Sequence, residues 1–175
     1  MRRILLSLII GSVCASIVLA GTKTSLPLHK LQVDRYGPVV IGMTPEVASA
    51  KLSIPLVSEG SLDEDGQACH YVYPSGDYQD IGFMVEHGYI TRIDVRSKKI
   101  STINNIRIGD SEETVKKAFP GKVLEEVHPY IGKEGKYLIV ETKPDYAFIF
   151  ETDRGKITGF RSGKLSSVRY IEGCL

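Results

Sequence analysis

Alternating apolar and polar residues recur along this chain and predict short β-strands joined by turns. The expected strands cover residues 69–73, 81–86, 89–95, 137–142, 147–152 and 156–161, with shorter ones near 56–57 and 123–124 and an extra one over 168–171. The turns Glu86-His87-Gly88 and Asp153-Arg154-Gly155 place a glycine where a tight hairpin requires positive φ. Because the connections are too short for parallel crossovers, we expect antiparallel meanders.

Two short helices are predicted where a capping residue precedes an apolar stripe. Thr44 is a good N-cap, Pro45 suits the first helical position, and this helix stops before Pro55. Ser111 caps the second helix, which ends before Pro120. Each helix therefore precedes one set of strands.

The segment before the first helix is echoed before the second one. Ile41-Gly42-Met43-Thr44-Pro45-Glu46 matches Ile108-Gly109-Asp110-Ser111-Glu112-Glu113, and at the same offset Phe83 aligns with Phe150 and Gly88 with Gly155. We therefore predict an α+β fold of two tandem helix-plus-antiparallel-sheet repeats, over residues 38–100 and 101–175. The repeats would form one continuous or paired curved sheet with the helices on one face.

The N-terminus has the pattern of a secretion signal. Arg2 and Arg3 precede the uncharged apolar run 4–19, and small residues before Ala20 predict cleavage after that residue. The alternative is a membrane anchor, but the run is short of the roughly 20 residues that a bilayer span needs. A lipoprotein signal at Cys14 is the other option, and the residues before that cysteine do not fit it. Residues 1–20 are thus predicted as a signal peptide and 21–37 as a leader arm.

Charge excludes the strongly basic classes of protein. Removing Arg2 and Arg3 with the signal leaves 20 of the 22 Lys and Arg residues against 21 Asp and Glu. No basic excess favours nucleic acid or anionic lipid as a partner, and we expect no stable membrane insertion after cleavage.

The cysteines predict a disulfide. Signal cleavage removes Cys14 and leaves Cys69 and Cys174, an even count in an oxidising compartment. The alternatives are two unrelated thiols or a metal site, which two cysteines without a CxxC spacing do not favour. The bridge would join the end of the second repeat to the first long strand of the first.

No pattern of catalytic or metal-binding residues stands out. The four histidines are scattered, neither an HExxH spacing nor a Gly-x-Ser-x-Gly turn occurs, and the acidic loop 63–66 lacks the other ligands of a calcium site. We therefore expect no metal, no cofactor and no enzymatic activity.

Strand alternation sorts the sheet into a core face and an open face. The expected core face carries Tyr71, Tyr73, Ile81, Phe83, Ile93, Leu138, Val140, Phe148, Phe150 and Phe160. The opposite face mixes Tyr, Arg, Met and carboxylates, which suits a recognition surface. Its best candidates for partner binding are Met84, Arg92, Tyr137 and Arg161. The alternative is an ordinary solvated face with cross-strand ion pairs.

The Ile-Gly-Met-Thr-Pro-Glu opening at residues 41–46, followed by a short helix and strands, resembles the β-lactamase inhibitory protein fold. The same fold occurs in the small lipoprotein of the outer-membrane assembly machine. The resemblance covers residues 38–174 and implies a curved sheet with helices behind it, without assigning a contact residue. The C-terminal segment 170–174, Tyr-Ile-Glu-Gly-Cys, also resembles the end of uncharacterised exported bacterial proteins.

These features together predict an exported, non-catalytic protein-binding module of the periplasm, or a secreted one. The protein would act as an envelope accessory factor or as an inhibitor of a secreted hydrolase. Its partner would be another envelope or secreted protein. The alternative is a small periplasmic hydrolase with its site between the repeats. That alternative requires His70, His128 and an acidic side chain to converge within about 3 Å.

Overall fold

The computed structural model describes residues 28–58, 69–76 and 80–174 and shows a mainly β protein. Of the described residues, 48% are in strands and 14% in helices. The helices α1 (Pro45–Leu52), α2 (Glu112–Ala118) and α3 (Leu165–Val168) have 8, 7 and 4 residues. The predicted α+β fold of two helix-plus-sheet repeats is therefore wrong, because helices this short form no layer over the sheet. The predicted signal peptide, 1–20, and the acidic loop, 63–66, lie outside the described residues.

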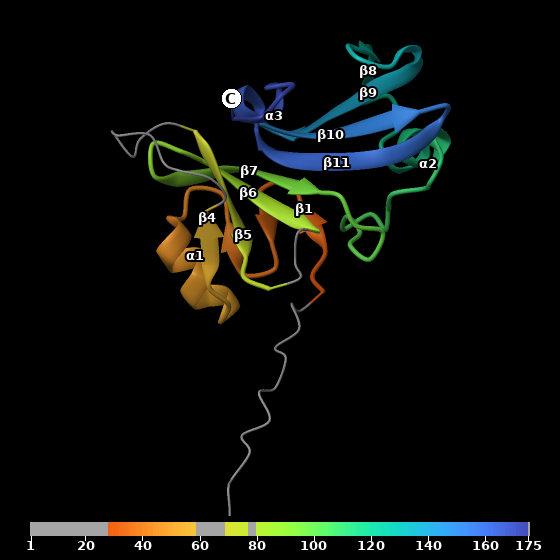
Figure 1. Cartoon of the computed structure of the whole chain (residues 1–175). Coiled ribbons are helices and arrows are strands. Elements are labelled where there is room, and N and C mark those ends of the chain that lie inside the picture. The colour runs from red at the N-terminus through yellow and green to blue at the C-terminus, as the bar shows by residue number, and fades with distance from the viewer. Residues whose placement is uncertain (1–27, 59–68, 77–79, 175) are drawn as a thin grey trace, which may run out of the picture.

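One eight-stranded antiparallel sheet forms the body of the molecule (Figure 1). Its order is β4 (Leu56–Ser58), β5 (His70–Pro74), β6 (Ile81–Glu86), β7 (Tyr89–Val95), β11 (Lys156–Lys164), β10 (Tyr146–Asp153), β9 (Gly132–Lys143) and β8 (Val123–His128). The two four-stranded halves join where β7 pairs with β11, with Val95 opposite Phe160 and Arg92 opposite Gly163. The sheet therefore ends in two edge strands, β4 and β8.

A small three-stranded sheet is formed by β1 (Leu31–Gln32), β2 (Arg35–Tyr36) and β3 (Val39–Val40). Leu31 and Tyr36 are completely buried, and the backbone of Leu31 is hydrogen-bonded to Ser101 and Ile103 at 2.8 Å each. Strands β1 and β2 fall in the predicted leader arm, 21–37, which thus contributes Leu31 and Tyr36 to the core.

The locally encoded turns are where the sequence predicts them. His87 and Gly88 have φ of 52° and 80°, and Arg154 and Gly155 have φ of 46° and 75°, as a tight hairpin turn requires. Thr44 caps α1 by accepting a hydrogen bond from the Val47 amide at 3.4 Å. The predictions of these turns and of this cap are confirmed. They could be made from the sequence because neighbouring residues alone determine such features.

Each face of the sheet is covered by its own apolar cluster. The larger cluster includes Phe83, Ile93 and Phe150 and packs against α1 and the small sheet. The smaller cluster joins Tyr137, Ile139, Ala147 and Ile149 to Val168 of α3. Figure 1 shows α1 and β1 on one side of the sheet, with α3 and the C-terminal end on the other.

The predicted core face is mostly confirmed, except on β5. Phe83 and its apolar neighbours on β6, β7, β9, β10 and β11 are buried in the larger cluster. Tyr71, however, pairs with Met84, while Val72 pairs with Phe83. Residues directly opposite in an antiparallel pair share a face, so Tyr71 and Tyr73 belong to the other face and their prediction is wrong.

The predicted disulfide between Cys69 and Cys174 is confirmed, with a sequence separation of 105. It attaches the C-terminal end to the residue that precedes β5. The extra strand predicted over 168–171 is wrong, because this part of the chain contains the end of α3 and a turn. The C-terminal end thus crosses one face of the sheet instead of joining its edge.

We expect removal of this disulfide to lower the free energy of unfolding by about 2–4 kcal/mol, because the bridge restricts a long loop in the unfolded chain. The Cys69→Ser/Cys174→Ser double variant tests this in urea unfolding without reductant. Reduction of the wild-type protein serves as the control and should give the same loss. A loss below about 0.5 kcal/mol in both samples would contradict the prediction.

Candidate functional site

The C-terminal segment 165–174, termed here the C-terminal cap, covers the face of the sheet opposite α1. Its helix α3 packs against β7, β10 and β11. Val168 is completely buried within the smaller apolar cluster. The cap is therefore anchored at one end by apolar packing and at the other by the Cys69–Cys174 disulfide.

A buried arginine holds the middle of the C-terminal cap. Arg92 Nη1 donates hydrogen bonds to the carbonyl oxygens of Tyr170 at 2.7 Å and Ser167 at 3.3 Å. Its Nη2 and Nε donate to Asp94 at 2.6 and 2.8 Å. Although burial opposes its charge, the attraction of Asp94 raises the pKa of the Arg92 guanidinium. Arg92 thus stays charged and connects the sheet to the cap backbone.

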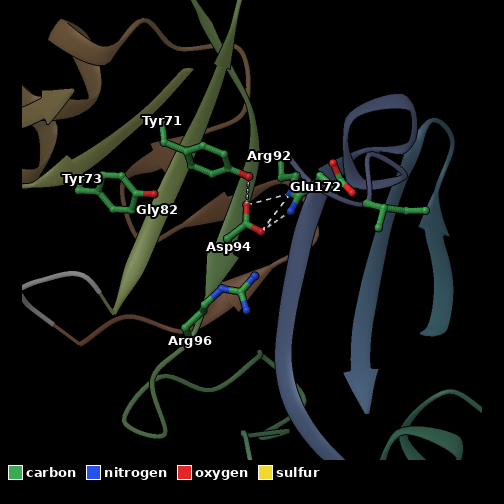
Figure 2. A pocket seen from close by; sticks show the side chains of 8 residues that line it. Tyr71, Tyr73, Gly82, Arg92, Asp94, Arg96 and Glu172 are labelled. Atoms are coloured by element: carbon green, nitrogen blue, oxygen red, sulfur yellow. Dashed lines mark hydrogen bonds and ion pairs between the residues drawn. The ribbon is translucent and has the colours of Figure 1, made fainter. Parts of the chain in front are cut away.

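A cavity of about 270 Å³ lies beside this ion pair (Figure 2). It is lined by Tyr71, Tyr73, Gly82, Arg92, Asp94, Arg96, Ile171 and Glu172. Gly82 leaves room for the two stacked tyrosine rings, since an added Cβ would lie 2.9 Å from Tyr73 and 3.2 Å from Tyr71. A small residue on β6 therefore shapes this cavity.

The acidic group in this first cavity already has its partners. The Tyr71 hydroxyl donates to Asp94 Oδ2 at 3.2 Å, and Figure 2 shows it pointing at that carboxylate. Burial and the negative charge of Asp94 raise the pKa of Tyr71, so the hydroxyl stays protonated. Because both oxygens of Asp94 accept hydrogen bonds from Arg92 or Tyr71, this group anchors the cap and is poorly placed to act as a general base.

A second cavity of about 220 Å³ lies nearer to β8 and shares Ile171 with the first. It is lined by Glu126, Val127, Pro129, Tyr137, Ile139, Ile149, Arg161, Arg169 and Ile171. The Arg161 guanidinium lies 5.0 Å from the centre of the Tyr137 ring. Its Nε donates to the Val168 carbonyl at 2.7 Å, and its Nη1 is paired with Glu151. The C-terminal cap therefore forms one wall of both cavities.

The four residues predicted to bind a partner are buried under or beside the C-terminal cap. Met84, Arg92, Tyr137 and Arg161 are exposed by 0, 2, 6 and 1%. They do share one face of the sheet, as the alternation predicts, but the C-terminal cap leaves almost none of their surface exposed. The apolar pair Leu165 and Val168, spaced as on a helix face, was the sequence signal for the element that covers them.

Exposed apolar side chains gather instead at the β8 end of the sheet. On β8 and the turn after it, Leu124, Val127, Tyr130 and Ile131 are exposed by 52, 65, 65 and 38%. The Tyr130 hydroxyl is hydrogen-bonded to Glu172 of the C-terminal cap. No strand in ranges 28–58, 69–76 and 80–174 pairs with the outer edge of β8. This end therefore combines an open backbone edge with apolar side chains.

The histidines needed for the hydrolase alternative do not converge. His70 lies on β5 and His128 on β8, six strand positions apart in the sheet, or roughly 25–30 Å. His128 Nδ1 accepts hydrogen bonds from the amides of Tyr130 and Ile131 at 3.2 and 3.3 Å. Within the described ranges, no group of three or more His, Cys, Asp or Glu residues could hold a metal ion. A helix long and apolar enough to cross a membrane is also absent from these ranges.

The chain thus folds as a mainly β protein with a disulfide-anchored cap and an open edge strand. No family model and no curated protein matches the sequence. The structure is similar to that of the uncharacterised protein YfeY from Escherichia coli, with a TM-score of 0.51 and 18% identity over 77% of this chain and 99% of that one. It is also similar to an extracellular protein containing an SCP domain from Bacillus anthracis str. Ames, with a TM-score of 0.48 and 17% identity over 80% of this chain and 50% of that one.

At this level of identity, the likeness to YfeY concerns the fold alone. The expected similarity to uncharacterised bacterial proteins is confirmed to that extent. The predicted β-lactamase-inhibitory-protein-like fold is not confirmed.

Proposed function

We propose that this protein is an exported, non-catalytic binding module that takes up an extended segment of another envelope or secreted protein along the outer edge of β8. The carrying observation is a six-residue edge strand, Val123–His128, that exposes Leu124 and Val127. The unpaired N–H and C=O groups of such an edge are a template for an added strand. The main-chain hydrogen bonds would give the added strand its affinity, and the apolar side chains of β8 would select its side chains.

The charges of β8 support uptake of a partner strand. Glu125 is paired with Lys116 at 2.7 Å and Lys136 at 2.8 Å, and Glu126 with Arg169 at 2.8 Å. Charged side chains usually protect an edge strand against pairing, but here both glutamates are neutralised by neighbouring cations. The opposite edge, β4, has only three residues and offers less backbone to a partner.

Export is supported by the N-terminal sequence and by the disulfide. Residues 1–20 have the pattern of a cleaved signal, and disulfides persist in oxidising compartments such as the periplasm or the cell exterior. The partner is accordingly a protein of the same compartment.

Single lysine substitutions on the two edge strands test the proposal. The mature chain, with its disulfide intact, captures partners from an envelope extract, and the purified partner is then titrated against each variant. We expect Leu124→Lys to weaken binding about tenfold or more, because it removes an apolar contact and places a charge on the edge.

Val57→Lys is the matched control, since Val57 is an apolar residue of β4 with 49% exposure, close to the 52% of Leu124. It should change the Kd of the purified partner less than about twofold. Equal binding by wild type and Leu124→Lys, or a loss confined to Val57→Lys, would refute a role for β8.

A further inference from the structure

Arg161, which lines the second cavity, has a buried nitrogen that lacks a hydrogen-bond acceptor. Arg161 is 1% exposed, and its Nε and Nη1 are bonded to Val168 and Glu151. Its Nη2 has no hydrogen-bond partner among the described residues. Buried donors of folded proteins are nearly always paired, so an unpaired guanidinium nitrogen beside a cavity indicates a missing acceptor.

The walls of the cavity are suited to an apolar group. Val127, Pro129, Ile139, Ile149 and Ile171 surround it together with the Tyr137 ring. A dry apolar cavity of about 150 Å³ accommodates benzene, so a cavity of about 220 Å³ has room for a six-membered ring with a short substituent. Val127 and Ile171 are also exposed to solvent, which places the mouth of the cavity between β8 and the C-terminal cap.

The charges around the cavity are already balanced. Arg161 is paired with Glu151, and Arg169 with Glu126. A carboxylate ligand would add a negative charge beside Glu151 and lose its own hydration on entry. A neutral carbonyl oxygen would accept the hydrogen bond without adding charge, so it is the acceptor that this cavity favours.

We propose that the second cavity binds an apolar group that carries a neutral carbonyl oxygen, with this oxygen accepting a hydrogen bond from Arg161 Nη2. The site lies on the capped face of the sheet and is separate from the outer edge of β8. Either a free small molecule or a side chain and backbone carbonyl of a peptide could supply this chemistry. The proposal does not depend on strand uptake by β8.

Three probes of similar size test the proposal by NMR titration of the mature, ¹⁵N-labelled chain: acetophenone, isopropylbenzene and benzoate. Acetophenone should shift the amide signals of Ile149 and Ile171 in a saturable way. It should bind about tenfold more tightly than isopropylbenzene, which has the same number of non-hydrogen atoms and the same branching but no acceptor. Benzoate should bind more weakly than acetophenone. Equal binding of acetophenone and isopropylbenzene, tighter binding of benzoate, or no saturable shift would overturn the proposal.

Two variants assign the effect to the cavity. Arg161→Lys keeps a positive charge opposite Glu151 but lacks Nη2, so it should bring acetophenone down to the affinity of isopropylbenzene. Should that variant fail to fold, Ile171→Trp replaces a 46% exposed residue and should fill the cavity, which would abolish the binding of both probes. Unchanged acetophenone binding in either folded variant would place the site elsewhere.

The source of the ligand is tested by a fourth probe. N-acetylphenylalanine methylamide presents a six-membered ring and neutral carbonyls on a peptide backbone. Tighter binding of this probe than of acetophenone would assign the site to a peptide partner, and the reverse order would assign it to a free small molecule. Both orders uphold the carbonyl chemistry, whereas failure of all probes would overturn this site and leave the β8 proposal untouched.

Discussion

Replacing Arg92 with alanine is expected to lower the free energy of unfolding by about 3–5 kcal/mol, measured by urea unfolding near neutral pH. The substitution leaves the carboxylate of Asp94, which is 8% exposed, without its cation. It also removes the hydrogen bonds to the carbonyl oxygens of Ser167 and Tyr170 in the C-terminal cap. Both effects arise because Arg92 lies between the sheet and the cap.

The matched control is Arg96→Ala, which changes an exposed arginine just after the end of β7 and should stay within about 0.5 kcal/mol of wild type. The Arg92→Met/Asp94→Leu double variant should lose less than Arg92→Ala, because neither charge remains buried alone. The alternation predicts Arg92 on an open face of the sheet, where its replacement would cost no more than about 0.5 kcal/mol. A loss of that size for Arg92 would mean that the cap does not bury it.

Phe83→Ala and Phe150→Ala are each expected to cost about 3–5 kcal/mol, because each leaves a cavity in the larger apolar cluster. Both side chains are completely buried. The Phe150 ring lies 5.9 Å from that of Phe148 and 5.8 Å from that of Phe160, between centroids. Urea unfolding of the two variants measures the loss in each half of the sheet.

Tyr89→Ala is the control for an aromatic side chain outside the core. Tyr89 begins β7 and is 52% exposed, so its replacement should stay within about 0.5 kcal/mol. A larger loss for Tyr89 than for Phe83 would show that the faces of the sheet are assigned the wrong way round.

Covering both faces of the sheet changes where a partner can bind. An open face of Tyr, Arg and Met side chains would have supplied a broad recognition surface, but the C-terminal cap buries its central residues. The edge strand β8 and the first and second cavities stay accessible beside the cap. Binding is therefore proposed at the outer edge of β8 and in the second cavity instead of on a flat face of the sheet.

Features determined by neighbouring residues could be predicted from the sequence. His87-Gly88 and Arg154-Gly155 form the predicted hairpin turns, and the second position of each turn is a glycine, which adopts positive φ without steric cost. Thr44 caps α1 because its side chain reaches an amide only three residues away. The pairing of Cys69 with Cys174 followed from their number, once a signal sequence was predicted to remove Cys14.

The sequence by itself thus determined the turns, a helix cap, most strands and the disulfide, whereas the tertiary structure decided which surfaces are covered. Alternation shows that Arg92 and Arg161 share a face with Met84, but Tyr170 of the segment that covers Arg92 lies 78 residues later in the chain. The register of β5 against β6 likewise decides the side on which Tyr71 lies, since a shift by one residue reverses every side chain of a strand. Register and coverage depend on contacts between distant segments, and a local pattern of apolar and polar residues does not specify them.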